Sequence, residues 1–157
     1  MKIILLITVL GITFFTNGQK AIHFEQIAFE YYKDSILNKY QPKNEITISS
    51  KIIEDGSYWN IDCLEEFNIS INDTAATVIS AIEKVDLNIG NDKRFKVRKY
   101  KKKKLPMVFA TAYMSFDIDK NITGIIENND GIITTYLFEI NQVGEIKKWC
   151  KGELKQD

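Results

Sequence analysis

Residues 108–118, VFATAYMSFDI, carry the clearest structural pattern in the chain. Apolar residues occupy every second position of this stretch without exception, and they are Val108, Ala110, Ala112, Met114, Phe116 and Ile118. Because the side chains of a strand alternate between two faces, the pattern predicts a β-strand with one buried face along its whole length. The neighbouring segments must therefore be compatible with a sheet.

Downstream of this stretch, turn residues separate further runs that are rich in β-branched and aromatic residues. Residues 119–121 form a turn into a short strand, 128–131 (NNDG) form a second turn, 132–140 form a strand, and 141–144 (NQVG) lead into a last strand at 145–151. Strands joined by short turns pair with their sequence neighbours. The second half of the chain therefore predicts an antiparallel meander.

Upstream, residues 21–40 show helical periodicity with a wide apolar arc, which is typical of a helix that lies across a sheet. Gln41-Pro42 ends this helix, because proline disfavours helical geometry in the residue before it. Between the helix and the meander, the sequence predicts a strand at 45–53 with a hairpin turn at Asp55-Gly56, a second strand within 58–71, a short helix from Asn72 or Asp73 to Val85, and a strand at 94–100. The expected fold is α+β, with one N-terminal helix packed on a curved antiparallel sheet.

Residues 1–18 have the layout of a secretory signal peptide, followed by one domain at 19–157. Met1-Lys2 precedes an apolar run at 3–15, and Thr16-Asn17-Gly18 offers small residues for cleavage before Gln19. A retained membrane anchor is the alternative, but the run is shorter than the roughly 20 apolar residues that cross a bilayer. We therefore expect cleavage, export to the periplasm or the medium, and no transmembrane anchor on the mature protein.

The composition favours a folded chain that works without a cofactor. Of its 157 residues, 45% are hydrophobic, and 21 basic and 21 acidic side chains give a formal net charge of zero. This profile is too apolar and too evenly charged for a disordered chain, and it argues against nucleic acid as a partner. One His and two Cys exclude a zinc site built from four such ligands and any haem or iron–sulfur centre that needs more cysteines, and we expect no metal and no cofactor.

The two cysteines allow two interpretations. Cys63 and Cys150 are 87 positions apart, which matches no metal or CxxC redox spacing. In an oxidising compartment they could form one disulfide between the middle of the chain and its last strand. The alternative is a pair of buried thiols that act as small hydrophobic residues. The sequence leaves both open, because it does not report the distance between the two residues.

A concentration of positive charge follows in the middle of the chain, where residues 93–104 include nine basic residues. One interpretation is a docking surface for an anionic glycan, lipopolysaccharide or an acidic protein. Its candidate binding residues are Lys96, Arg98, Lys99, Lys101, Lys102, Lys103 and Lys104. The other interpretation is a solvated edge strand whose lysines discourage pairing between sheets.

Two further possibilities concern ligands and catalysis. Tyr58 and Trp59 could form an aromatic wall for a ligand, which Trp149 would join if Cys63 bonds Cys150; the alternative is ordinary core packing. A small hydrolase or isomerase with an Asp or Glu base in a sheet cavity is the enzymatic alternative to a binding protein, because histidine is scarce. We expect a non-enzymatic, exported binding or cell-envelope protein.

Two features carry a resemblance to known proteins. The Asn17-Gly18-Gln19 junction, the heavy use of Ile, Lys and Asn, and the ending with Tyr136, Phe138 and Trp149 resemble small exported proteins of Bacteroidota, many of them uncharacterised. A helix followed by a curved meander is similar to the cystatin-like and nuclear-transport-factor-2-like families. That resemblance implies a cupped sheet, which hosts both enzymes and binding modules, and it identifies no functional residue.

Overall fold

The computed structural model describes residues 22–40, 45–54, 58–70, 86–98, 107–117, 119–129 and 131–155. The signal-peptide prediction, the Asp55-Gly56 turn, the helix expected to end at Val85, and Lys99 with the lysines at 101–104 lie outside these residues. In the described part of the chain, no helix is long and apolar enough to cross a membrane.

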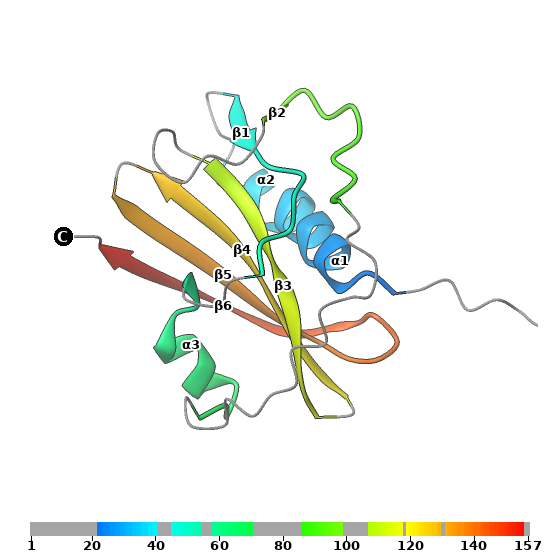
Figure 1. Cartoon of the computed structure of the whole chain (residues 1–157), viewed down its shortest axis with the longest axis vertical. Coiled ribbons are helices and arrows are strands. Elements are labelled where there is room, and N and C mark those ends of the chain that lie inside the picture. Colours follow the sequence, from blue (N-terminus) through cyan, green and yellow to red (C-terminus); the bar gives the residue numbers. More distant parts are fainter. Residues whose placement is uncertain are drawn as a thin grey trace, which may run out of the picture.

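The described elements form an α+β fold in which helices lie on both faces of one sheet (Figure 1). The helical elements are α1 (Phe24–Tyr31), the π-helix η1 (Tyr32–Ile36), α2 (Leu37–Tyr40) and α3 (Ile61–Glu66). The strands are β1 (Ile46–Ile48), β2 (Phe95–Val97), β3 (Met107–Asp117), β4 (Lys120–Asn129), β5 (Ile132–Ile140) and β6 (Ile146–Lys155).

The six strands form one mixed sheet in the order β2-β1-β3-β4-β5-β6. The meander from β3 to β6 is antiparallel, as predicted. β1, however, pairs in parallel with both β2 and β3. The expectation of a wholly antiparallel sheet is wrong, because the chain passes from β1 to β2 through α3 and a long connection, and such a crossover joins parallel strands.

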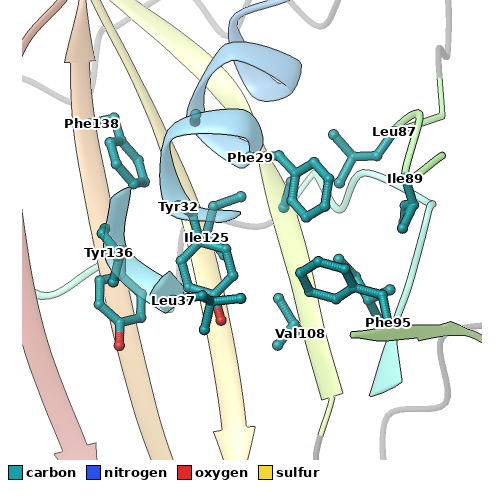
Figure 2. Packing of buried hydrophobic residues seen from close by; sticks show 14 of the residues in the cluster. Phe29, Tyr32, Leu37, Leu87, Ile89, Phe95, Val108, Ile125, Tyr136 and Phe138 are labelled. Carbon is teal, nitrogen blue, oxygen red and sulfur yellow. The ribbon is translucent and has the colours of Figure 1, made fainter. Parts of the chain in front are cut away.

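Residues 24–40 are helical in one continuous run, which confirms the predicted helix except at its first residues. This run packs across the meander and buries an aromatic-rich core between helix and sheet (Figure 2). The core includes Phe29, Tyr32, Leu37, Phe95, Val108, Ile125, Tyr136 and Phe138. The wide apolar arc of the helix is explained by this contact, because it touches several strands at once.

β3 does not keep one face along its length. Its pairing with β4 shifts register between Thr111 and Met114, which is a β-bulge. An extra residue reverses the side to which the following side chains point. Val108 packs in the core under α1, whereas Met114 and Phe116 pack in the core under α3. The single apolar face predicted for 108–118 is therefore wrong beyond the bulge.

A buried carboxylate holds α1 to this bulge. Glu25 lies in the first turn of α1, and its Oε1 accepts a hydrogen bond of 3.0 Å from the backbone N–H of Tyr113. The ring of Phe24 meets the ring of Tyr113 edge to face, with centroids 4.8 Å apart. Residues in a β-bulge lose backbone hydrogen-bond partners on the neighbouring strand. Glu25 thus supplies a partner where the sheet provides none and fixes the position of α1 along the sheet.

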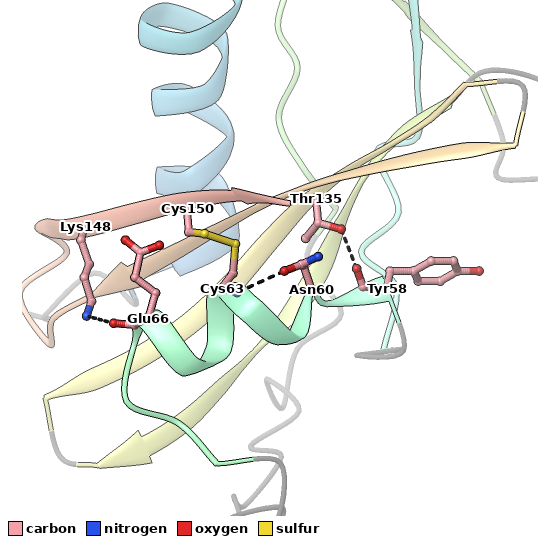
Figure 3. Close-up of a disulfide and its surroundings, with 7 residues drawn as sticks. All are labelled: Tyr58, Asn60, Cys63, Glu66, Thr135, Lys148 and Cys150. Atoms are coloured by element: carbon pink, nitrogen blue, oxygen red, sulfur yellow. Dashed lines mark hydrogen bonds between the residues drawn. A yellow bond between two sulfur atoms is a disulfide. The ribbon is translucent and has the colours of Figure 1, made fainter. Parts of the chain in front are cut away.

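The strand expected within 58–71 is wrong, because α3 forms there instead (Figure 3). The Asn60 side chain caps this helix by accepting a hydrogen bond of 3.1 Å from the Cys63 N–H. Cys63 forms a disulfide with Cys150 on β6, with their Cα atoms 5.6 Å apart. Asn60 also rests on Gly152, where any Cβ would overlap its side chain. The Asn60 cap and the disulfide therefore stabilise a helix in this segment.

The disulfide generates a stability prediction. Replacing both Cys63 and Cys150 with Ser should lower the free energy of unfolding by about 2 to 5 kcal/mol, because the unfolded chain regains the freedom of a long closed loop. Urea unfolding followed by circular dichroism measures the loss. Reduction of the wild-type protein should shift its midpoint in the same direction. An unchanged midpoint under reducing conditions would show that the bond does not contribute to stability.

Candidate functional site

The residues described from the basic segment lie at one margin of the sheet, on and beside β2. We call Lys93, Lys96 and Arg98 the basic edge; all three are exposed. Lys96 lies 3.5 Å from Glu45, and both side chains are about half exposed. Lys93 and Arg98 form no ion pair with a carboxylate of the described residues. The basic edge therefore carries positive charge that the described part of the protein does not neutralise.

Arg94 belongs to the same basic segment but has a structural role. Its guanidinium lies 2.6 Å from an Asp92 carboxylate oxygen, and it donates hydrogen bonds to the Lys33 backbone carbonyl at 3.1 Å and to Asn38 Oδ1 at 2.6 Å. The hydrogen bond with Asp92 raises the pKa of Arg94 and lowers that of Asp92. Arg94 thus ties β2 to the helical run and is not available for a partner.

The structure describes two of the seven candidate binding residues predicted from the sequence. Lys96 and Arg98 are exposed on the basic edge, and the lysines at 99 and 101–104 lie outside the described residues. Val97 is 53% exposed, although the alternating pattern places it on the same face as buried Phe95. β2 therefore presents an apolar side chain between two basic ones at the margin of the sheet.

A second cluster lies between the helical run and the sheet, and sequence reasoning missed it. The hydroxyl of Tyr32, a fully buried residue at the start of η1, donates a hydrogen bond to Glu127 on β4. The ring of Tyr136 lies 5.3 Å from that of Tyr32 (Figure 2). π-Helical turns are frequent at functional sites, and Tyr32 lies at the start of one.

Burial dominates the ionisation of this cluster. It raises the pKa of the Glu127 carboxyl, against the opposing effects of the Tyr32 hydrogen bond and of Lys151. Burial and the Glu127 charge likewise raise the pKa of Tyr32 and of Tyr136. A carboxyl of this kind can accept or donate a proton closer to neutral pH than an exposed one. The signal available in the sequence was an acidic residue at an inward-facing position, two residues after buried Ile125.

The aromatic residues singled out in the sequence serve the core. Trp59 is buried, and its Nε1 donates a hydrogen bond of 2.8 Å to Thr111 Oγ1, which confirms core packing. Trp149 does not join it, even though the neighbouring Cys150 bonds Cys63. Adjacent residues of a strand point to opposite faces. Trp149 therefore packs on the α1 side, with its ring 6.4 Å from that of Tyr136.

Comparisons with protein-family models, with curated proteins and with solved structures gave no significant match. The chemistry of the described residues is therefore the basis for assigning a function.

The raised pKa of Glu127 predicts a pH dependence of stability. A group whose pKa is higher in the folded state stabilises the fold while protonated, and this contribution is lost as pH rises through the folded pKa. Relative to Glu127→Gln, the wild type should lose stability as pH rises from about 4.5, the ordinary value, into the raised range. Urea unfolding at a series of pH values measures the difference.

Glu145→Gln is the matched control, because Lys147 lowers the pKa of the exposed Glu145 carboxyl. The stability contributed by Glu145 should be lost as pH falls, which is the opposite sign. If the wild type and Glu127→Gln kept parallel stability profiles over the whole series, the ionisation assigned to Glu127 would be wrong.

Proposed function

We propose that this protein is an exported, non-enzymatic binding protein that docks an anionic partner through the basic edge and the lysines at 99 and 101–104. The observation that carries the proposal is the exposed, incompletely neutralised charge of Lys93 and Arg98 at the margin of the sheet. The chain continues from Arg98 directly into the five further lysines. Positive charge is thus concentrated in one segment, 93–104, of an otherwise mildly acidic chain.

The chemistry favours a partner with many dispersed negative charges. Lysine is a compact point charge without the planar fork that suits arginine to a single phosphate. Lysines make up all but one of the basic residues in the proposed surface. Such a surface suits an acidic glycan, lipopolysaccharide or the acidic face of a protein. The balanced total charge argues against nucleic acid.

The packing between helix and sheet supports a binding protein over an enzyme. The space between α1 and the meander is filled by large, almost fully buried side chains, among them Phe29, Tyr32, Ile125 and Phe138. A hydrolase or isomerase needs room for its substrate beside the catalytic base. Within the described part of the chain, buried Glu127 is the feature that favours the enzymatic alternative, and its Oε1 accepts the hydrogen bond of the Tyr32 hydroxyl.

Export is part of the proposal. The layout of residues 1–18 supports it, and so does the Cys63–Cys150 disulfide, because such bonds persist mainly in oxidising compartments. We further propose a cystatin-like or nuclear-transport-factor-2-like architecture, supported by a helix that precedes a four-stranded meander. The mass of the native protein tests the export step. The measured mass should correspond to a chain that begins at Gln19 and has lost the two thiol hydrogens of Cys63 and Cys150.

The docking surface predicts salt-dependent binding. Wild-type protein should bind immobilised heparin, lipopolysaccharide or polyglutamate with an affinity that falls steeply with salt. Replacing the lysines at 101–104 with Gln should abolish binding, and Lys96→Gln with Arg98→Gln should lower the slope of log affinity against log salt by about 2, one for each charge lost. Surface plasmon resonance across a salt series provides both quantities.

Lys147→Gln is the matched control for Lys96→Gln alone, because it removes one exposed lysine from the opposite margin of the sheet. Lys147 is 49% exposed, close to the 51% of Lys96. The control should bind like the wild type. Equal losses in Lys96→Gln and Lys147→Gln would show that total charge, and not the basic edge, governs binding.

A further inference from the structure

The margin of the sheet opposite β2 is formed by β6, which is the longer of the two edge strands (Figure 1). β6 pairs with β5 on one side, and no other strand of the described residues pairs with its second side. Edge strands are ready templates for pairing with another chain, and proteins usually protect them. Here the distribution of side chains along the strand indicates a specific partner.

The two faces of β6 can be assigned from its contacts. Trp149 packs on the α1 side, so Lys151, Glu153 and Lys155 point to that side too. Cys150 bonds Cys63 of α3, so Gly152 and Leu154 point to the α3 side. On the α1 side, charges of both signs therefore alternate along the free edge, and Lys151 lies 2.7 Å from Glu153 within the strand.

We propose that this edge pairs with the same edge of a second copy, antiparallel, around a two-fold axis at Gly152. In this register Lys151 lies opposite Glu153 of the second copy, Trp149 opposite its Lys155, and Cys150 opposite its Leu154. Each relation occurs twice because of the symmetry. Opposite charges and cation–aromatic pairs directly across two strands stabilise a sheet. The pairing spans residues 149–155 and joins both sheets into one.

Neighbouring registers are excluded by charge. An axis at Lys151 places the two copies of Lys151 opposite each other. An axis at Glu153 places the two copies of Glu153 opposite each other and Lys151 opposite Lys155. Like charges directly across two strands destabilise a sheet. Intermediate registers would bring an α1-side residue opposite an α3-side residue, which the alternation of a strand does not permit.

The position of α3 excludes an axis at Cys150. α3 begins beside Gly152, where Asn60 rests, and ends beside Lys148, whose Nζ donates a hydrogen bond of 3.0 Å to the Glu66 carbonyl (Figure 3). With the axis at Gly152, the two copies of α3 extend in opposite directions from the axis. An axis at Cys150 would bring them side by side over strands about 4.8 Å apart, closer than the roughly 8–10 Å that packed helices need.

Exposed apolar side chains at this margin support a covered edge. Leu154 on β6 is 38% exposed, and Ile61, next to Asn60 at the start of α3, is 50% exposed. In the proposed dimer Leu154 lies against Cys150 of the second copy, and the two copies of Ile61 approach the axis. The pairing therefore covers apolar surface that the single chain leaves in water.

Charge reversal with complementation tests the proposal. Sedimentation velocity of the purified protein over a concentration series should show a dimer. Lys151→Glu and Glu153→Lys should each weaken dimerisation about tenfold or more, because each places like charges across the axis twice.

Mixing the two variants in equal amounts should restore association as a heterodimer. The introduced glutamate of one variant then faces the introduced lysine of the other, and the unchanged Glu153 of the first faces the unchanged Lys151 of the second. Both pairs across the axis again have opposite charges. Only contacts between chains can be restored by mixing, so a purely structural effect of either substitution would persist.

Lys147→Glu is the control, since Lys147 lies on β6 outside the paired residues and interacts with Glu145. It should dimerise like the wild type, and thermal unfolding should show that all variants remain folded. A wild type that stays monomeric at every concentration would overturn the proposal. A dimer that survives both reversals, or two variants that fail to associate when mixed, would do so as well.

Discussion

The fold depends on one constraint: the meander has apolar side chains on both faces, and each face needs its own cover. On the central strand β4, Ile125 points to the α1 side, whereas Ile122 and Ile126 contribute to two clusters on the other side. The helical run at 24–40 covers the first face. The second is covered by the segment from Tyr58 to Ile69, which is too short to form a large core of its own. A disulfide, a helix cap and two lysines hold it in place, since Lys148 donates to the carbonyl of Glu66 at the end of α3 and Lys120 donates to that of Phe67 just after it.

Local patterns in the sequence predict the parts of this fold that local physics determines. The helical run and the turns of the meander follow from periodicity and turn residues over a few positions. The bulge in β3 does not, because it depends on Glu25, far away in the chain, which accepts the hydrogen bond of the Tyr113 N–H. α3 was not predicted for the same reason. Its cap is local in the sequence, but Cys150 and Gly152, which position the helix, belong to the last strand.

The candidate site shows the same division. The sequence indicates a concentration of basic residues, but it cannot separate Arg94, which bonds Asp92, Asn38 and Lys33, from Arg98, which remains exposed. Counting charges therefore overestimates the number of basic residues available to the proposed docking surface. Glu127 was missed for the opposite reason, because a lone acidic residue before a turn looks solvated in a sequence. Its pairing with Tyr32 depends on how the helical run crosses β4.

The two margins of the sheet carry two different arrangements of charge. At β2, Lys93 and Arg98 form no ion pair with a carboxylate of the described residues, so positive charge is in excess there and suits the proposed polyanion. At β6, Lys151 and Glu153 alternate, so the charge is balanced and suits a copy of itself. Pairing through β6 would leave both basic edges at the far ends of the joined sheet. Two weak contacts on one extended polyanion gain avidity from their linkage, so the dimer would strengthen binding without any new contact to the partner.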